Sequence, residues 1–475
     1  MNNSTTLDAT TSQATDAQDR EAAVAMLVLA WSSTEPARIG EVIIPTDRPA
    51  AFGRGDGEPG ETRAVLVRQR PGHDQPTPAL DNPFLSRRHL LLRATGAGIA
   101  VENLGKKALL HDGQPAETKV TVHDGETLEI PGQALFLCVR RARTIAPCPS
   151  VPEREVRGFG EPDDHGLVGE SPLAWQLRER CALVGGLSAH VLLLGDSGTG
   201  KELAAQAIHA RSTRAKRPLV ARNAVTFPPG LIDAELFGNI AGYPNPGMPA
   251  RPGIIGEADG TTLFLDEIAE MPHELQSHLL RVLDGGEYNR LGEATRRRAD
   301  LRVIAATNRD ALALKHDLAA RLGLRITLPP LDARREDIPL IARYLLNTIA
   351  RKDPQIGARF FASWNGKTGE PRLAPALVRE LLAHHYKTNV RELEALLLSS
   401  LVGSRGATLE LTDELVAELR PTVRIATPVC TAEQVRAALD KHGGVRELAW
   451  RELGLANRYV LKRLMKKHGI ADAED

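Results

Sequence analysis

One short stretch combines glycines, hydroxyl side chains and a lysine in a spacing that suits phosphate binding. It lies between the apolar run HVLLL and the helix-like LAAQAIHA, and consists of Gly195, Asp196, Ser197, Gly198, Thr199, Gly200, Lys201 and Glu202. Glycines let backbone N–H groups curl around phosphate oxygens, the following helix adds its positive N-terminal end, and lysine supplies a point charge. The order strand, loop, helix predicts a P-loop, with a plain glycine-rich turn as the alternative. Glu202 stands where a Ser or Thr hydroxyl usually meets Mg²⁺.

Two further apolar runs end in polar residues that suit hydrolysis. The run TTLFL leads into Asp266 and Glu267, and the run RVIAA leads into Thr307 and Asn308. Asp266 can hold Mg²⁺ through water, while Glu267 orients or deprotonates the attacking water. Thr307 and Asn308 suit contact with a γ-phosphate, although Asn-Arg-Asp is also a common turn sequence. With the P-loop, these residues predict a site that splits a nucleoside triphosphate.

The bulk properties of the chain limit where it acts. Its 475 residues suggest about three domains, and the content of 42% hydrophobic and 25% charged residues is typical of a globular protein in water. Lys plus Arg and Asp plus Glu both total 60, so contact with nucleic acid must come from a local patch. The cysteines are scattered, and the N-terminal sequence has no signal-peptide pattern. We therefore expect a cytoplasmic protein.

Composition divides the chain into successive blocks. The predicted blocks are a disordered tail (1–24), a β-sandwich (25–143), a linker (144–166), an α/β domain with a helical lid (167–419), a second linker (420–430) and an all-α unit (431–475). Short β-type runs between turn residues favour the sandwich. Apolar strands that alternate with amphipathic helices favour the α/β domain. The predicted fold class is therefore multidomain.

The motifs of the central block resemble the AAA+ domain of bacterial enhancer-binding proteins, the sigma-54-dependent transcription activators. In order, they read GDSGTGKE, RNAVTFPPGLIDAELFG, GTTLFLDEI, RVIAATNRD, LPPLDARREDIPLIARYLL and NVRELEALL. The resemblance covers residues 167 to about 419, includes the glutamate after the P-loop lysine, and implies an α/β AAA+ P-loop NTPase that uses ATP and Mg²⁺. It also implies a ring, commonly a hexamer, because arginine fingers of this family reach the nucleotide of the neighbouring subunit.

The same resemblance assigns roles to individual residues outside the P-loop. Asn223 resembles the residue that switches the catalytic Glu267, and Arg391 resembles the sensor arginine of the lid. Arg321 falls on one arginine-finger position, and Lys315 falls on the other. Lysine keeps the charge of arginine but lacks the planar fork that pairs with phosphate oxygens.

The loop between ELFG and TLFLDE departs from the pattern of that family. The family's loop reads Gly-Ala-Phe-Thr-Gly-Ala, and its Phe and Thr grip sigma-54 as ATP is turned over. Here Tyr243 is followed by Pro244 and Asn245, which occupy the two gripping positions. Prolines fix φ and should restrict movement of the loop. Two interpretations remain open: a loop retuned to another surface through Tyr243 and Met248, or a remnant that no longer remodels polymerase.

The first block carries the motifs FGRG, LSRRH and VENLG, which resemble a forkhead-associated (FHA) domain, a reader of phosphothreonine peptides. The resemblance places Arg54, Ser86 and Arg87 where that family holds the phosphate, with a charge fork and a hydroxyl donor. His89 matches a mainly structural position. The family's Asn-Gly, which grips the peptide backbone, is missing, because VENLG is followed by KKA. A sandwich used only for subunit contacts is the alternative.

The last block contains amphipathic stretches with glycines at the breaks, TAEQVRAALDKHGG, VRELAWREL and NRYVLKRLMKKHG. They fit a helix-turn-helix and resemble the Fis-type module that ends the same activator family. Asn457, Arg458 and Lys462 are the candidates to reach DNA base edges. Merely solvated basic helices are the alternative.

The sequence as a whole favours an ATP-dependent, DNA-binding transcription regulator of the sigma-54 activator family. Hydrolysis of ATP coupled to remodelling of a transcription complex is the expected activity. The expected partners are an enhancer-like DNA site, sigma-54 RNA polymerase, a phosphothreonine protein or peptide, and further copies of the chain. The alternatives are a sigma-54-independent regulator or a phosphopeptide-recruited scaffold, in which ATP only sets the oligomeric state.

Overall fold

The computed structural model describes residues 23–55, 60–227, 231–309, 314–419 and 432–442, together with 449–450, 452–453, 455, 461 and 464–465. The chain divides into two compact units, Met1–Thr412 and Asp413–Asp475. Residues 1–22, which make up most of the predicted tail, lie outside the described residues, and the first strand begins at Ala23.

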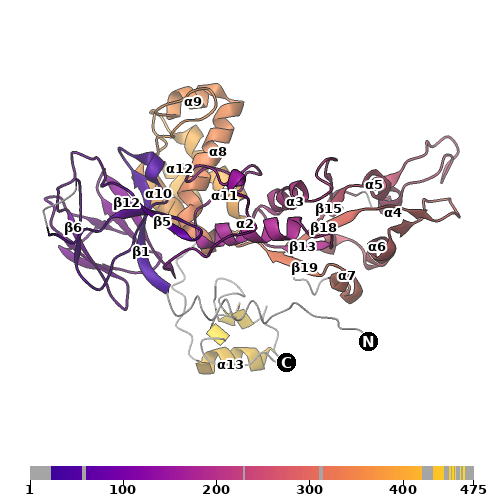
Figure 1. Ribbon diagram of the computed structural model, residues 1–475, viewed down its shortest axis with the longest axis horizontal. Coiled ribbons are helices and arrows are strands. Elements are labelled where there is room, and N and C mark those ends of the chain that lie inside the picture. The colour runs from indigo at the N-terminus through magenta and orange to yellow at the C-terminus, as the bar shows by residue number, and fades with distance from the viewer. Residues whose placement is uncertain are drawn as a thin grey trace. The chain divides into compact units, whose positions relative to one another are not determined.

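A β-sandwich forms the first part of the larger unit (Figure 1). One sheet has the strand order β5-β4-β2-β1-β12-β11-β8-β9, and the other has the order β10-β7-β6-β3. Neighbouring strands are antiparallel throughout both sheets. The strands are β1 (Ala23–Ser32), β2 (Val42–Ile43), β3 (Ala50–Phe52), β4 (Leu66–Arg70), β5 (His73–Pro76), β6 (Leu90–Ala94), β7 (Ile99–Asn103), β8 (Leu110–His111), β9 (Gln114–Pro115), β10 (Lys119–Val122), β11 (Thr127–Ile130) and β12 (Ala134–Ala142), with the 3-10 turn η1 (Pro36–Arg38) after β1.

Apolar side chains from the two sheets meet in one core. Leu27 and Phe136 come from the first sheet, and Phe52 and Leu92 come from the second. The rings of Phe52 and Phe136 pack edge to face with their centroids 5.6 Å apart, which is a favoured aromatic geometry. This core confirms that the N-terminal block is rich in β-structure.

A parallel sheet is the centre of the next part of the chain (Figure 1). Its strand order is β14-β15-β18-β13-β19, and its strands are β13 (Val191–Leu194), β14 (Val220–Asn223), β15 (Thr262–Asp266), β18 (Arg302–Thr307) and β19 (Leu324–Thr327). Alternate side chains point to opposite faces. Leu263 and Leu265 join the core beneath α6 and α7, whereas Phe264 and Ile304 join the core beneath α2 and α3. The long apolar runs of these strands are explained by this burial on both faces.

Helices cover the sheet and continue into a helical lid. Those around the sheet are α2 (Pro172–Gly185), α3 (Lys201–Ala210), α4 (Ile232–Phe237), α5 (Gly253–Glu257), α6 (His273–Gly285) and α7 (His316–Arg321), together with the 3-10 turns η2 (Glu153–Glu155), η3 (Ala224–Thr226) and η4 (Ile268–Glu270) and the hairpin β16 (Glu287–Tyr288) and β17 (Arg297–Arg298). The lid contains η6 (Leu331–Asp337), α8 (Ile338–Lys352), α9 (Pro354–Phe360), α10 (Pro375–Ala383) and α11 (Asn389–Gly403).

The smaller unit is helical where it is described. It includes α12 (Asp413–Leu419) and α13 (Ala432–Lys441), and its apolar cluster joins Val435 and Leu439 of α13 to Leu455 and Leu461. The predicted DNA contacts Asn457, Arg458 and Lys462 lie outside the described residues. Within the described part of the chain, no helix is long and apolar enough to cross a membrane.

The sandwich packs directly against the lid through β12 and α10 (Figure 1). Trp31 Nε1 donates to the carbonyl of Leu373 at 2.7 Å. Arg141 of β12 forms an ion pair with Glu336 of η6, with Nη1 2.7 Å from Oε1, and both side chains are nearly buried. Burial raises the pKa of Glu336, and the neighbouring guanidinium of Arg141 partly offsets this increase. These contacts bind the two parts into one body.

Residues 144–166, which the composition predicts to be a linker, contact both neighbouring parts. The ring of Phe159 lies beneath the guanidinium groups of Arg68 and Arg70, at 5.4 and 5.5 Å. The carbonyl of Gly160 accepts from Arg343 Nη2 of α8 at 3.0 Å. The segment therefore fills the junction between the sandwich and the lid.

Candidate functional site

The predicted P-loop lies between β13 and α3, at the carboxyl edge of the parallel sheet. Gly198 and Gly200 have φ values of 75° and 97°, a region that favours glycine. A Cβ atom at Gly198 would approach the carbonyl oxygen of Thr388 to 2.1 Å, so a side chain is excluded there. Gly200 is the N-cap residue of α3, and Thr199 Oγ1 donates to the carbonyl of Asp196 at 2.9 Å. The loop therefore adopts a tight turn at a helix N-terminus, an arrangement suited to anions.

Lys201 is the buried cation of this loop. Its side chain is 7% exposed, and Nζ donates to the carbonyls of Gly195 at 2.9 Å and Asp196 at 3.4 Å. The same Nζ lies 3.7 Å from Glu267 Oε1. Glu202 is an exposed residue of α3, and its Oε1 accepts from Gln206 Nε2 at 3.4 Å. Lys201 therefore connects the P-loop after β13 to the carboxylate that follows β15, two strands away in the sheet.

Asp266 ends β15 and Glu267 follows it, while Asn308 follows β18, the strand between β15 and β13. Glu267 has a left-handed φ of 53°, and its backbone N–H donates to Asp266 Oδ1 at 3.0 Å. Asn308 N donates to Glu267 Oε2 at 3.1 Å. The structure thus brings together Lys201, Asp266, Glu267 and Asn308, because adjacent parallel strands end at the same edge.

Asn223 lies at the same edge, one strand further along. It ends β14 and is opposite Asp266 in the strand register. Its side chain oxygen accepts from Val225 N at 2.9 Å and so caps η3. The side chain is thus held as a cap, next to the strand end that carries Glu267.

The lid contacts the P-loop through the start of α11. Arg391 Nη1 donates to Ser197 Oγ at 2.9 Å, and Val390 N donates to the carbonyl of Gly198 at 3.1 Å. Asn389 Nδ2 donates to the carbonyl of Ser197 at 2.9 Å, while its Oδ1 accepts from Leu331 N at 2.7 Å. Sequence reasoning predicted Arg391 but missed Asn389, which is 1% exposed and has a φ of 50°.

Arg321 and Lys315 lie away from this cluster, at the two ends of α7. Arg321 is exposed and forms an ion pair with Asp284 of α6. Lys315 Nζ donates to Ser277 Oγ at 2.5 Å. The contacts of both side chains thus lie on α6 of the same chain, and Arg321 remains accessible to solvent.

The loop with the altered sequence is built as a narrow turn. Asn239 pairs with Arg251 in an antiparallel bridge, and Gly242 N donates to the carbonyl of Met248 at 2.8 Å. The buried Asn239 side chain donates to the carbonyl of Tyr243 at 3.2 Å. The ring of Tyr243 lies against Gly292, where a Cβ would be 2.8 Å away, yet Tyr243 is 41% exposed. Pro244 and Asn245 are exposed at the tip.

The predicted phosphate-binding residues of the sandwich lie on neighbouring loops. Arg54 N donates to the carbonyl of Ser86 at 3.1 Å, and Ser86 N donates to His89 Nδ1 at 3.1 Å. Arg54 and Arg87 are exposed, and Ser86 is partly buried. Burial lowers the pKa of His89, so its ring favours the neutral form that accepts this bond.

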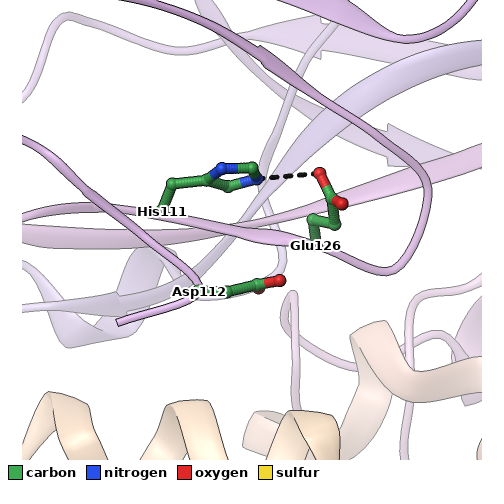
Figure 2. A group of neighbouring side chains, drawn as sticks. All are labelled: His111, Asp112 and Glu126. Carbon is green, nitrogen blue, oxygen red and sulfur yellow. Dashed lines mark hydrogen bonds and ion pairs between the residues drawn. The ribbon is translucent and has the colours of Figure 1, made fainter. Parts of the chain in front are cut away.

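A second group of polar side chains joins two turns of the sandwich (Figure 2). Ligand atoms of His111, Asp112 and Glu126 lie within 4.8 Å of one another. Glu126 Oε2 lies 2.8 Å from His111 Nε2 and accepts from His123 N at 2.8 Å, and Asp112 Oδ1 accepts from Thr127 N at 2.9 Å. These hydrogen bonds tie the β8–β9 turn to the β10–β11 turn and account for the cluster without a metal.

Comparison with known proteins shows what the central domain resembles. Residues 167–328 match the family described as "Sigma-54 interaction domain". The Nif-specific regulatory protein of Azotobacter vinelandii is 37% identical over 332 residues, which cover 66% of this chain and 60% of that protein. The transcriptional regulatory protein ZraR of Klebsiella oxytoca is 35% identical over 322 residues, 63% of this chain and 69% of that protein.

One solved structure matches a similar share of the chain. The NtrX protein of Brucella abortus, determined in complex with ADP, is 31% identical, and the match covers 65% of this chain and 70% of that chain with a TM-score of 0.47.

Proposed function

Because the chain belongs to the family of regulators that carry a sigma-54 interaction domain, we propose that it hydrolyses ATP to act on sigma-54 RNA polymerase. The single observation that carries the proposal is the contact of Lys201 with Glu267 across the end of the intervening strand β18, where the backbone N–H of Asn308 donates to the same carboxylate. This geometry joins a phosphate-binding loop to a group that can activate water. A P-loop retained for structure alone would not need a carboxylate there.

The residues of this chain divide the work of hydrolysis. Lys201 and the N–H groups of the P-loop bind the phosphates, Arg391 extends this contact from the lid, and Asn308 orients the carboxylate of Glu267. Glu267 accepts a proton from the attacking water. Asn223, at the neighbouring strand end, alters the position of Glu267 when it leaves its capping bond.

A magnesium ion fits the donor set at the end of β15. Asp266 is a partly buried carboxylate at the end of β15, one strand removed from the P-loop strand β13, and would hold the ion through water. Glu202 supplies no inner hydroxyl ligand. The bound ion would neutralise charge on the phosphate oxygens.

Arg321 acts on the nucleotide of a neighbouring copy in a ring, commonly a hexamer in this family. Its exposure at the end of α7 and its distance in sequence from the P-loop support action between protomers. Lys315 at the other finger position adds charge, but its Nζ is bound to Ser277. The ring closes through repeated head-to-tail interfaces.

The sandwich and the helical C-terminal unit recognise the binding partners of the chain. The sandwich binds a phosphothreonine segment through Arg54, Ser86 and Arg87 in the manner of an FHA domain, and the helical C-terminal unit binds DNA as a Fis-type helix-turn-helix. The loop at residues 242–248 contacts sigma-54 in an altered way, because its tip presents Pro244 and Asn245 while Tyr243 packs on Gly292.

The test replaces Glu267 by Gln in the full chain. We expect hydrolysis of ATP to fall by about 10²- to 10⁴-fold while nucleotide binding persists, because the amide keeps the shape but cannot accept the proton. Glu270→Gln is the matched control, since Glu270 lies three residues further on and pairs with Arg309. Equal activity of the Glu267 variant and the wild type would exclude the proposed site.

A second measurement addresses the partner. Sigma-54 is mixed with the wild-type chain and a mimic of the γ-phosphate transition state, and capture is compared with capture by the nucleotide-free chain. Nucleotide-dependent capture supports remodelling of polymerase. Intact hydrolysis without any capture would instead favour the sigma-54-independent regulator.

A further inference from the structure

Two loops of the sandwich are fixed against each other by His89. The backbone carbonyl of His89 accepts from Leu104 N at 2.8 Å and from Gly105 N at 3.1 Å. A Cβ atom at Gly105 would lie 2.5 Å from His89 Nε2, so the backbone there runs directly over the imidazole ring. The opposite ring nitrogen accepts from Ser86 N. The loop that follows Leu104 is therefore a direct neighbour of the loop that carries Ser86 and Arg87.

Asn103 braces this second loop from inside. Its Nδ2 donates to the carbonyl of Lys107 at 2.7 Å, and its Oδ1 accepts from Gly105 N at 2.9 Å. The side chain amide is therefore occupied within its own loop. Its effect is to hold Lys106 and Lys107 in a fixed turn, and both lysines are exposed.

The two loops carry several positively charged side chains. Among the described residues, no ion pair involves Arg54, Arg87, Lys106 or Lys107. Arg88, by contrast, pairs with Glu61 at 2.7 Å. Cations gathered on neighbouring loops favour an anionic partner over a neutral one.

Apolar side chains adjoin the same cations. Phe84, two residues before Ser86, is 73% exposed, and Leu104 is 40% exposed. An exposed aromatic ring next to a charged face is common where a partner contributes both apolar and polar contacts. This combination favours a protein segment over the sugar-phosphate backbone of a nucleic acid.

We propose that this face binds a protein segment in which phosphothreonine is flanked by further negative charge, and that an apolar side chain of the segment packs on Phe84. Lys106 and Lys107 bind the flanking Asp, Glu or second phosphate. The inference rests on the proposed function, in which Arg54, Ser86 and Arg87 hold the phosphothreonine. Charge-assisted contacts to a second anion replace the backbone grip that Asn103 does not supply.

The experiment uses the full chain and a degenerate phosphothreonine-peptide library, arrayed by the residue at each flanking position. We expect selection of Asp, Glu, phosphoserine or phosphothreonine at one or more positions. The variant Lys106→Ala/Lys107→Ala should lose that selection and bind the selected peptide roughly three- to tenfold more weakly, with a smaller salt dependence. The Phe84→Ala variant should instead lose the preference for an apolar residue in the bound peptide.

Lys119→Ala is the matched control, because Lys119 is an exposed lysine of the same sheet that already pairs with Glu102. If phosphothreonine peptides bind with no preference for acidic neighbours, or if the double lysine variant keeps that preference, the inference about Lys106 and Lys107 is wrong. Binding of these peptides would still support the proposed phosphothreonine site. If no phosphothreonine peptide binds and Arg54→Ala changes nothing, the proposed function of the sandwich fails first. Binding of DNA with equal strength at this face would also overturn the inference.

Discussion

Two regions of the α/β domain are held in different ways. One is the strand-end site, formed by Lys201, Asp266, Glu267 and Asn308, and the other is the loop at residues 239–251. At the strand ends, Lys201 is buried, and Glu267 receives contacts from both Lys201 and Asn308. In the loop, the hydrogen bonds run mostly within the turn itself, and the tip at Pro244 and Asn245 is exposed. The strand-end site is fixed by contacts from several elements at once, whereas the loop is fixed mainly by hydrogen bonds within its own turn.

This difference determines which residues can be substituted without disturbing the strand-end site. A substitution at Glu267 or Lys201 removes a partner from a buried charged group, which is costly. A substitution at Pro244 or Asn245 leaves every contact of the strand-end site in place. Under the proposed function, we therefore expect changes at the loop tip to alter partner binding without loss of hydrolysis.

The largest effect is expected at Arg321, which tests whether hydrolysis depends on a second protomer. Arg321→Ala should lower ATP hydrolysis by about 10³-fold, because an arginine finger stabilises charge in the transition state. Its ion pair with Asp284 is exposed, so folding should be unaffected. Turnover is measured with purified protein at concentrations that support assembly.

A mixing experiment separates action in trans from action in cis. Arg321→Ala protein and Glu267→Gln protein, each inactive alone, should regain partial activity when mixed, because some interfaces then combine an intact Glu267 with an intact Arg321. Absence of any regain, with mixed assembly demonstrated, would contradict a shared site. Lys315→Met serves as the comparison, and its effect should be smaller because Lys315 is bound to Ser277.

The second prediction concerns the loop. Replacing Pro244 by Phe and Asn245 by Thr restores the two gripping residues of the family and should raise nucleotide-dependent capture of sigma-54 by about tenfold, the effect of roughly 1.4 kcal/mol. ATP hydrolysis should stay within about twofold. Loss of hydrolysis in this variant would show that the loop and the strand-end site are not separable. Unchanged capture would show that Tyr243 already supplies the contact.

The third prediction tests the lid contact. Asn389→Gly keeps the positive φ but removes the bonds to Ser197 and Leu331. At about 1 kcal/mol for the bond to Ser197 of the P-loop, we expect nucleotide affinity to fall about fivefold. Asn347→Ala removes three side-chain hydrogen bonds inside the lid and should lower stability without that change in affinity. Calorimetric titration with ATP distinguishes the two variants.

The smallest effect is expected from His385. Its hydrogen bond to Asp332 raises the pKa of the imidazole above 6.5. The folded state thus keeps a proton that the unfolded state releases, so the stabilisation is complete below about pH 6.5 and is lost as pH rises through the folded pKa. The melting temperature should fall more steeply over that range in the wild type than in His385→Gln. Parallel curves would show that the pair does not contribute.

Sequence reasoning reached the strand-end residues because their positions follow from local pattern. The apolar runs before Gly195, Asp266 and Thr307 predict strands, and parallel strands place their carboxyl ends together. The role of Asn389 could not be reached in this way. It depends on a positive φ and on docking of the lid against Ser197, which is 192 residues away in sequence.

The junction around Phe159 shows a second limit. Its segment is rich in Pro and charge, a composition that indicates the absence of regular secondary structure. Composition does not report packing, and here Arg68, Arg70 and Arg343 enclose the segment. The long-range pair of Arg141 and Glu336 likewise leaves no trace in local sequence pattern.

Attachment of the sandwich to the lid has a mechanical consequence. Glu336 pairs with Arg141 of the sandwich, and the adjacent Asp337 accepts from Ser171 Oγ at the start of α2. Any displacement of η6 would therefore be passed to the sandwich as well as to α2, so that a partner held by the sandwich, as proposed, would be moved together with the lid.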